Sequence, residues 1–324
     1  MFNIVKNKQE FLNTTLESIF NEISQTLMIG KFDDIKTLLE RYNIELFDNQ
    51  KGMYKTTYEI LSEISEKLSF NAEKVKNDIV QWIRGWFAEN GPDCNAVIGI
   101  SGGKDSSVVA ALCVEALGKE RVVGVMMPDG KQSDIDDAFK VCEHLNILHT
   151  VVNIGKTTDI LRQSILDGLV GQDGFSYCGI NFSKQANINL PPRIRMTTLY
   201  AVSQSINGRV ACTDNLSESY IGYSTRWGDN VGDFCPLANL TSEEVVAVGD
   251  ALGLPYELTH KVPSDGLCGQ TDEDRFGFTY EVLNKYIRTG ICENKETQKK
   301  IDEMHKRNLF KSEPIPKFPY PNKI

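Results

Sequence analysis

The sequence contains few of the residues that build metal centres and disulfide frameworks. Only four of its 324 residues are histidines, and none of its eight cysteines lies in a CxxC pair. There is no HExxH motif and no cysteine–histidine cluster, which argues against a zinc site. Several cysteines lie inside apolar segments, so we expect reduced, mostly buried thiols and a cytoplasmic protein.

Long apolar runs and an excess of basic residues are also missing. No stretch approaches the roughly 20 apolar residues that a membrane-spanning helix needs, and the first residues, MFNIVKNKQEF, lack the apolar core of a signal peptide. Lys and Arg number 35 against 44 Asp and Glu, for a formal net charge of −9. Binding to a polyanion needs clustered cations. We therefore expect neither a membrane nor a nucleic acid as a partner.

Two regions differ in pattern. Residues 1–68 have apolar residues at helical spacing and no recognisable site motif, which predicts a helical appendage that packs on the main domain or on a partner chain. The residues with this spacing are Leu12, Leu16, Ile19, Phe20, Ile23 and Leu27. Residues 69–324 are predicted to form the functional domain.

The second region alternates apolar strands with amphipathic helices. The expected helices span 72–89, 106–118, 133–146, 157–167 and 191–206, and the expected strands span 96–100, 121–126, 148–153 and 209–213. This alternation predicts an α/β fold, a Rossmann-like parallel sheet with helices on both faces. Ligands of such sheets bind beyond the carboxyl ends of the strands, which points to the loops after Ile100, Met126 and Thr213.

One of these loops has an unusual composition, AVIGISGGKDSS at 96–107. Gly102 and Gly103 let backbone N–H groups face a ligand, and the helix that starts near Ser106 adds its positive end. These features predict a polyphosphate site, with an ordinary serine-capped turn as the alternative. The residues expected to contact ATP here are Gly99, Ile100, Ser101, Gly102, Gly103, Lys104, Asp105 and Ser106.

Asp105 does not suit a phosphate site by itself, because a carboxylate repels phosphate unless a cation lies between them. Mg²⁺ is the natural bridge, since it takes one or two carboxylates together with phosphate oxygens. The segment is neither GxxxxGK[ST] nor GxGxxG. We therefore expect the site to hold a leaving pyrophosphate and to cleave ATP at its α-phosphate.

The motif SGGKDS resembles the pyrophosphate-binding loop of the ATP pyrophosphatases. NLPPRIRMTTLYA (189–201), TDNLSESYIGYSTRWGDNVGDFCPL (213–237) and HKR (305–307) resemble NAD synthetases, and the resemblance covers roughly residues 70–310. It implies an adenine nucleotide α-hydrolase-like fold and a homodimer. It also implies a ligase of NAD biosynthesis that adenylates the carboxylate of deamido-NAD with ATP and lets ammonia displace AMP.

The resemblance also implies roles for single residues. Asp105 and Glu218 would be the catalytic pair that holds Mg²⁺, and Thr213, Ser242 and Ser264 would contact ATP. The residues expected to contact deamido-NAD are Arg193, Tyr223, Arg226, Asp233, His305 and Lys306.

Two of these expectations also have support from the residues themselves. Arg193 and Arg195 are two apart on one helix, so they point to nearly opposite faces and cannot share a ligand. We expect a structural or ATP-side ion pair for Arg195. The segment GYSTRWGDNVGD (222–233) is too polar for a core, and the aromatic rings of Tyr223 and Trp227 could stack on a flat base; a flexible surface loop is the alternative.

The sequence departs from the family pattern at two places. Ser242 stands where a lysine that contacts ATP is common, so that charge is missing or comes from elsewhere, with Lys104 and Lys131 as candidates. In KVPSDGLCGQTDEDRFGF (261–278), Ser264 keeps a hydroxyl, whereas Gly266 replaces an aspartate. We expect 263–275 to be a mobile lid, with a disordered connector as the alternative.

The number of residues before the synthetase-like region indicates which nitrogen donor the chain uses. A glutamine-hydrolysing domain commonly needs ~100–200 residues and a nucleophilic cysteine, whereas about 70 residues precede the synthetase-like region and the first cysteine is Cys94. We expect free ammonia, or ammonia from a separate glutaminase subunit. Two alternatives stay open, another ATP pyrophosphatase such as a tRNA-modifying enzyme, and a non-catalytic nucleotide-binding module.

Overall fold

The computed structural model describes residues 47–48, 53–54, 70–132, 135–169, 182–261 and 272–319. The chain forms two compact units, Met1–Asn71 with Glu281–Gln298 and Ala72–Tyr280 with Lys299–Ile324. The domain boundary at residue 68 stays a prediction. Among the helices in these ranges, none is both long and apolar enough to cross a lipid bilayer.

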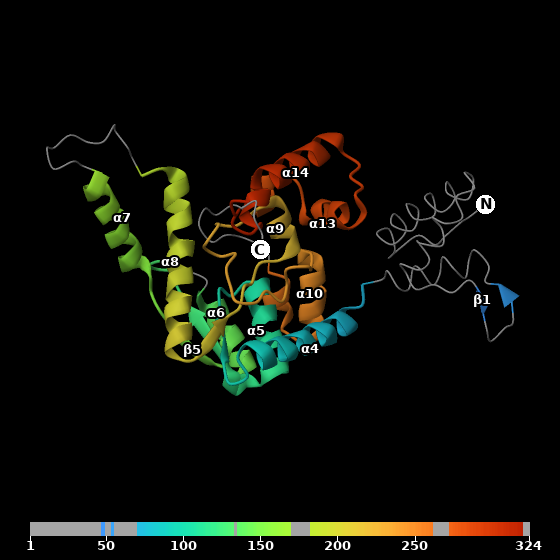
Figure 1. The fold of residues 1–324 in the computed structure, drawn as a ribbon, viewed down its shortest axis with the longest axis horizontal. Coiled ribbons are helices and arrows are strands. Elements are labelled where there is room, and N and C mark those ends of the chain that lie inside the picture. Colours follow the sequence, from blue (N-terminus) through green and yellow to red (C-terminus); the bar gives the residue numbers. More distant parts are fainter. Residues whose placement is uncertain are drawn as a thin grey trace. The chain divides into compact units, whose positions relative to one another are not determined.

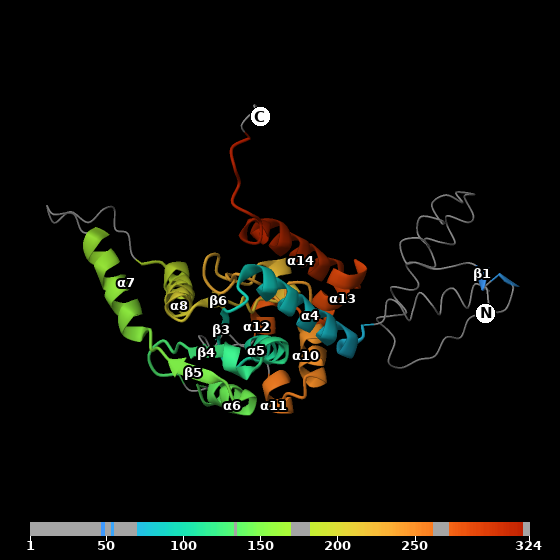
Figure 2. The same ribbon diagram turned by 60° about the horizontal axis from the view of Figure 1, so that its bottom comes forward.

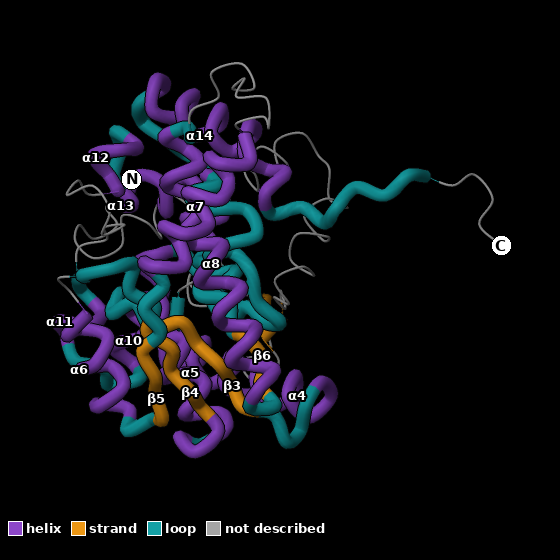
Figure 3. The backbone as a smooth tube through the Cα atoms, turned by 90° about the vertical axis from the view of Figure 1, so that its left-hand side faces the viewer, coloured by secondary structure: helices purple, strands orange, loops and turns teal. Residues whose placement is uncertain are grey.

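The second unit is built on a parallel sheet of four strands (Figures 1 and 3). Their order is β5 (Leu148–Val151), β4 (Val122–Met126), β3 (Asn95–Gly99) and β6 (Gly208–Val210). The parallel α/β sheet predicted from the sequence is thereby confirmed. Because β3 and β6 are neighbours, with Val97 opposite Val210, the loops that follow them leave the same edge side by side.

Helices cover both faces of this sheet, and Figure 2 shows α5 and α8 on opposite sides of β3 and β4. Alternate strand residues explain the two layers. Ile98 packs into the larger core, with α4 (Ala72–Asn90), α5 (Lys104–Leu117), α6 (Ile135–Leu145) and α10 (Ser242–Ala251). Its neighbour Val97 packs into the smaller core on the other face, under α8 (Lys184–Ser205).

Helix α8 begins seven residues earlier than the predicted start at 191. Ser183 caps it, since its side chain accepts a hydrogen bond from the backbone N–H of Ala186 at 3.1 Å. Pro191 and Pro192 lie inside the helix and are buried. The sequence suggested a start at the prolines because proline is common in the first turn of a helix and rare inside one.

The remaining elements are helices of four to fifteen residues and two 3₁₀ turns. They are α7 (Gly155–Leu169), α9 (Leu216–Ile221), α11 (Tyr256–Thr259), α12 (Asp272–Phe276), α13 (Tyr280–Thr289), α14 (Lys295–Asn308) and the 3₁₀ helices η1 (Lys119–Arg121) and η2 (Leu309–Lys311).

Four residues of the region predicted to be helical form strands instead. β1 (Phe47–Asp48) and β2 (Met53–Tyr54) pair in an antiparallel ladder. The sequence between them, NQKG, contains the Asn and Gly that favour turns, and this local signal outweighs the helical spacing there. The rest of 1–68 lies outside the described residues.

The turn after β3 depends on Gly102. Its φ is +79°, and a Cβ there would lie 2.7 Å from the backbone nitrogen of Ala138 and 2.9 Å from Cβ of Asp137. Both the backbone conformation and the contact with α6 therefore require glycine.

We predict that Gly102→Ala lowers the free energy of unfolding by about 1–3 kcal/mol, because it adds both backbone strain and a clash with α6. Gly103→Ala is the matched control. Gly103 has φ of −86°, and within the described part of the chain the one atom that lies within 4 Å of its added Cβ is Oγ of Ser101 at 3.3 Å. Urea unfolding should separate the two variants; equal losses would show that the φ and the contact at Gly102 are unimportant.

Candidate active site

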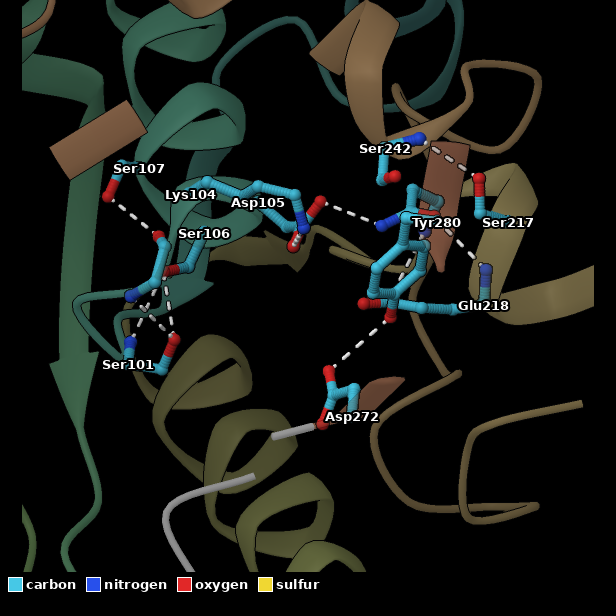
Figure 4. Close-up of polar contacts among 12 residues, drawn as sticks. Ser101, Lys104, Asp105, Ser106, Ser107, Ser217, Glu218, Ser242, Asp272 and Tyr280 are labelled. Carbon is cyan, nitrogen blue, oxygen red and sulfur yellow. Dashed lines mark hydrogen bonds and ion pairs between the residues drawn. The ribbon is translucent and has the colours of Figure 1, made fainter. Parts of the chain in front are cut away.

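The loop between β3 and α5 is fixed by its own hydroxyl groups (Figure 4). The backbone N–H of Ser101 donates to Oγ of Ser106 at 3.3 Å, and the two hydroxyls lie 3.1 Å apart. Ser106 and Ser107 both donate to the carbonyl oxygen of Gly103. Ser101 itself is exposed, so the loop offers its outer side to a ligand at the N-terminus of a 14-residue helix.

Lys104 and Asp105 form an ion pair at the start of α5. Nζ of Lys104 lies 2.8 Å from Oδ2 of Asp105, and Lys104 is only 5% exposed. Burial would lower the pKa of Lys104, but the charges of Asp105, Glu218 and Asp272 outweigh it and raise that pKa above its ordinary value. The ammonium group is therefore held in its charged form among carboxylates.

Helix α9 brings Glu218 to the same edge. Asn215 caps this helix in a capping box, in which its side chain accepts from the backbone N–H of Glu218 and the Glu218 carboxylate accepts from the backbone N–H of Asn215. Nδ2 of Asn215 also donates to Oδ1 of Asp105 at 2.9 Å. Burial first, and then the charge of Asp105, raise the pKa of Glu218 well above its usual range.

Asp272 and Tyr280 form another side of this cluster (Figure 4). The hydroxyls of Tyr223 and Tyr280 donate to Oδ1 and Oδ2 of Asp272 at 3.1 and 3.3 Å. The Tyr280 ring centroid lies 5.9 Å from Nζ of Lys104. Burial, followed by the charges of Glu218 and Asp272, raises the pKa of the Tyr280 hydroxyl, so this hydroxyl stays protonated and donates.

The structure describes only the end of the expected lid. Residues 272–275 belong to helix α12, where Asp272 is buried and Nη1 of Arg275 donates to the hydroxyl of Tyr223 at 2.9 Å. The lid over 263–275 stays a prediction. Residues 263–271, including the predicted ATP contact Ser264, lie outside the described residues.

The other predicted ATP residues are distributed around the same edge. Ser242 is buried at the start of α10, where its backbone N–H donates to Oγ of Ser217 at 3.0 Å. Thr213 follows β6 and is half-buried. Of the two lysines considered as replacements for a cation at 242, Lys104 lies in the cluster, whereas Lys131 is exposed.

Two of the residues predicted to contact the dinucleotide meet in a separate place. Nε of Arg193 donates to the carbonyl oxygen of Arg226 at 3.2 Å. The guanidinium carbon of Arg226 lies 5.0 Å from the ring centroid of Trp227 and 5.1 Å from that of Phe310. Trp227 is 47% exposed and has φ of +63°, a left-handed conformation that bulky residues rarely adopt.

Arg195 points elsewhere, as its spacing from Arg193 predicts. Its Nε donates to the carbonyl oxygen of Met127, just after β4, at 3.0 Å. Burial lowers the pKa of Arg195, and the charges of Asp129 and Asp229 oppose that shift. The contact joins α8 to the sheet.

Asp233, His305 and Lys306 do not join either cluster. Asp233 accepts hydrogen bonds from the hydroxyl of Tyr200 at 3.2 Å and from the backbone N–H of Val210 at 2.8 Å. His305 stacks on Tyr220 at a centroid distance of 4.1 Å, and its Nδ1 lies 2.7 Å from the Tyr220 carbonyl oxygen. Lys306 is exposed. Tyr223, whose hydroxyl bonds Asp272, belongs to the cluster around Lys104 and Asp105.

Sequence reasoning missed three residues of the cluster, Asn215, Asp272 and Tyr280. Asn215 carried a usable signal, since Asn followed three residues later by Glu is the pattern of a capping box. Asp272 lies in an acidic run, DEDR, in which charge alone does not separate a buried carboxylate from a solvated one. Tyr280 carries no local signal.

The donor set fits a magnesium ion that is shared with a phosphate. Within the ranges that the structure describes, no group of three or more His, Cys, Asp or Glu side chains could hold a metal ion. Asp105 and Glu218 supply two carboxylates, which is the number Mg²⁺ usually takes from a protein when substrate phosphates complete its shell. Their mutual repulsion, visible in the raised pKa of Glu218, favours a bound cation.

We predict that Glu218→Gln raises the melting temperature by a few degrees near pH 7.5. A carboxyl group whose pKa is raised in the folded protein is stabilised in its protonated form. The cost of ionising Glu218 is therefore absent below its ordinary pKa of 4.5 and grows as the pH rises toward the folded value. Glutamine has no charge to ionise and can keep the capping box.

Thermal unfolding at several pH values checks this prediction, and the gain should vanish near pH 4. Glu244→Gln is the matched control, because Glu244 occupies the same position in the capping box of Thr241 at the start of α10. A Glu218→Gln protein that melts below the wild type at pH 7.5 would contradict it.

Comparison with known proteins agrees with this geometry. A family model described as NAD synthase matches residues 75–315. The NH(3)-dependent NAD(+) synthetase of Methanococcus aeolicus is 39% identical over 231 residues, which are 70% of this chain and 86% of that protein. The protein of the same name from Archaeoglobus fulgidus is 36% identical over 253 residues, 76% of this chain and 96% of its own.

A solved structure described as NMN synthetase from Francisella tularensis has a TM-score of 0.68 and 30% identity, and the match covers 78% of this chain and all of that one. An NH3-dependent NAD synthetase from Campylobacter jejuni has a TM-score of 0.58 and 26% identity, over 77% and 99% of the two chains. The span of the family model, which includes both the SGGKDS loop and helix α9, shows that this chain belongs to the NAD synthase family.

Proposed function

We propose that this chain converts deamido-NAD, ATP and ammonia into NAD, AMP and pyrophosphate. The observation that carries the proposal is the meeting of Asp105 with the Asn215–Glu218 turn at one edge of the sheet, within the residues that the NAD synthase model matches. The ammonia-dependent relatives support the nitrogen donor. The same match counts against an RNA-modifying ATP pyrophosphatase and against a non-catalytic module.

The first step makes the carboxylate reactive. An oxygen of the nicotinate carboxylate forms a bond to the α-phosphorus of ATP, and the bond from that phosphorus to the bridging oxygen breaks, which releases pyrophosphate. The residues from Ser101 to Ser106 bind the pyrophosphate through backbone N–H groups, hydroxyls and the N-terminus of α5. Lys104 places its positive charge where negative charge accumulates on the leaving group.

The second step forms the amide. The lone pair of ammonia attacks the carbonyl carbon, the bond from that carbon to the AMP oxygen breaks, and the nitrogen loses a proton. Only neutral ammonia carries this lone pair, so the rate should rise with pH through the range where ammonium loses its proton.

A magnesium ion held by Asp105 and Glu218 would neutralise the phosphate oxygens and draw charge toward the leaving pyrophosphate. The capping box of α9 and the ion pair at Lys104 hold the two carboxylates at the sheet edge. Thr213, Ser242 and Ser264 would contribute hydroxyls to ATP.

Deamido-NAD would extend toward the place where Arg193 meets Arg226 and Trp227. Arg193 and Arg226 would grip its phosphates, and the half-exposed Trp227 ring would stack on its flat base. The strained backbone at Trp227 supports a functional role for this loop, since such conformations concentrate at binding sites. Tyr223, Asp233, His305 and Lys306 are the further residues proposed for this substrate.

We also propose a homodimer, with residues 1–68 as an appendage outside the catalytic machinery. Helix α7 exposes three apolar side chains, with 67% exposure at Ile160, 40% at Leu161 and 37% at Ile165. Apolar residues gathered on one helix support a covered surface there. We also propose a cytoplasmic location and, as one candidate source of ammonia, a separate glutaminase subunit.

Product analysis tests the proposed activity. With ATP, Mg²⁺, ammonium and deamido-NAD, the purified chain should form NAD, AMP and pyrophosphate in equal amounts. Asp105→Asn should lower the rate at least 100-fold with the fold unchanged, because the lost charge matters only when the metal and ATP are bound. ADP as the nucleotide product would refute the proposal.

Two comparisons sharpen this assay. Glutamine should not replace ammonium in the purified chain, and equal rates with both would reveal a glutaminase activity in the chain itself. Because one similar structure is described as an NMN synthetase, nicotinate mononucleotide should be offered beside deamido-NAD. Faster amidation of the mononucleotide would replace NAD by NMN as the product.

A variant lacking residues 1–60 should keep its synthetase activity and its dimeric mass in light scattering, because no proposed site residue lies in the deleted part. Circular dichroism should confirm that the truncated protein is folded. Complete inactivity of a folded truncation would show that the appendage completes the site.

A further inference from the structure

Asn215 lies between the two carboxylates that the proposed metal site requires. Its Nδ2 donates to Oδ1 of Asp105 at 2.9 Å, and its Oδ1 accepts from the backbone N–H of Glu218 at 3.1 Å. Its own backbone N–H faces Oε2 of Glu218 at 3.5 Å. Asp105 and Glu218 are 113 residues apart in the sequence, and this one side chain contacts both.

The partners fix the orientation of the Asn215 amide. The backbone N–H of Glu218 can only donate, so the atom that faces it is the amide oxygen. A carboxylate can only accept, so the atom that faces Asp105 is the amide nitrogen. Asn215 is fully buried, with no exposed surface. Reversing the amide would therefore lose both bonds without compensation from water.

The backbone around Asn215 is also held in place. Its φ and ψ of −105° and 170° are those of an N-cap residue. The carbonyl oxygen of Asn215 accepts from Ser219, and the next residue, Leu216, donates its N–H to the carbonyl oxygen of Leu240. The amide therefore presents its nitrogen to Asp105 from a fixed point.

The two oxygens of Asp105 consequently have different partners. Oδ1 is bound to Asn215, and Oδ2 pairs with Nζ of Lys104 at 2.8 Å. Lys104 carries its charge on a flexible four-carbon stem, whereas the Asn215 amide is fixed at both ends. A cation that approaches Asp105 competes with Lys104 for Oδ2, while Oδ1 keeps the carboxylate in its orientation.

A helix cap alone does not require asparagine. Helices α8 and α10 are capped by the hydroxyls of Ser183 and Thr241, and serine, aspartate and asparagine are comparable N-cap residues. Only the amide also supplies a donor that reaches Asp105. Aspartate at 215 would place a third carboxylate against Asp105.

We propose that Asn215 is a positioning residue that couples Asp105 to Glu218 and orients Asp105 for the divalent cation of the ATP complex. This inference rests on the proposed function for its metal, and it assigns to Asn215 a role that a helix cap does not need. Residues that orient metal ligands through hydrogen bonds typically change metal affinity or activity by about 10–100-fold when they are replaced.

The test uses the full chain with Asn215→Ser, which keeps the cap and loses the donor. Mn²⁺ binding in the presence of α,β-methylene-ATP is measured by electron paramagnetic resonance, and kcat, KM for ATP and the half-saturating Mg²⁺ concentration are measured in parallel. We expect a folded variant that melts a few degrees below the wild type, because one buried hydrogen bond to a carboxylate is lost, with Mn²⁺ affinity at least about 10-fold weaker and a matching rise in the Mg²⁺ requirement. Wild-type Mn²⁺ affinity in a stable Asn215→Ser protein would overturn the inference.

Ser183→Ala is the matched control, because it removes an N-cap bond of the same 3.1 Å length from α8. It should lower the melting temperature by a few degrees and leave Mn²⁺ affinity unchanged. If it weakened Mn²⁺ binding as much as Asn215→Ser does, the weakening would follow from lost stability and not from the lost amide donor, and the inference would be overturned.

Asn215→Thr carries the test if the serine variant does not fold, because it keeps a capping hydroxyl, adds no charge and fills more of the space left by the amide. It should weaken Mn²⁺ binding as the serine variant does, and wild-type Mn²⁺ affinity in a folded Asn215→Thr protein would overturn the inference. The proposed function fails separately, if the wild type binds Mn²⁺ and the ATP analogue but forms no NAD from deamido-NAD.

Discussion

The hydrogen bond from Asn215 to Asp105 joins two parts of the chain that the sheet alone only brings near each other. Strands β3 and β6 are parallel neighbours, so the loops after them leave the same edge. Parallel pairing fixes the strands, whereas the side chains beyond their ends depend on local contacts. The capping box of α9 and the amide of Asn215 supply those contacts and bring Asp105 and Glu218 to one place.

This convergence has an electrostatic cost. Asp105, Glu218 and Asp272 surround a region in which Lys104 is almost fully buried, and the raised pKa of Glu218 records both its desolvation and the repulsion from Asp105. The charge of Lys104 offsets part of this cost, since it lowers the pKa of Glu218 while its own pKa is raised by the same carboxylates. A site that concentrates negative charge is less stable than a neutral one, and it binds a divalent cation more strongly. Stability and function thus oppose each other at Glu218.

Much of the fold and part of the site could be predicted from the sequence, for identifiable reasons. Continuous apolar runs such as AVIG and VVGVM are typical of strands that are covered on both faces, and their alternation with helices predicts the parallel sheet. The SGGKDSS loop was recognisable because the role predicted for it depends on backbone N–H groups and on glycine. Asp272 and Tyr280 were not recognisable, because their roles depend on the packing of α12 against Tyr223. The early start of α8 was missed because tertiary packing buries Pro191 and Pro192 within the helix, against their local preference.

The two halves of the proposed site are built in different ways. On the proposed ATP side, hydrogen bonds between residues close in sequence hold the loop after β3 and the cap of α9. Such local contacts leave a recognisable pattern in the sequence. On the dinucleotide side, the proposed residues also hold the structure together. Asp233 bonds Tyr200 and contributes, after burial, to raising the pKa of that hydroxyl to about 12, while His305 stacks on Tyr220. A substrate that binds there must share these side chains with the fold. Replacing Asp233 or His305 will therefore alter packing as well as binding, and the same holds for Arg226, whose guanidinium group packs against Trp227 and Phe310.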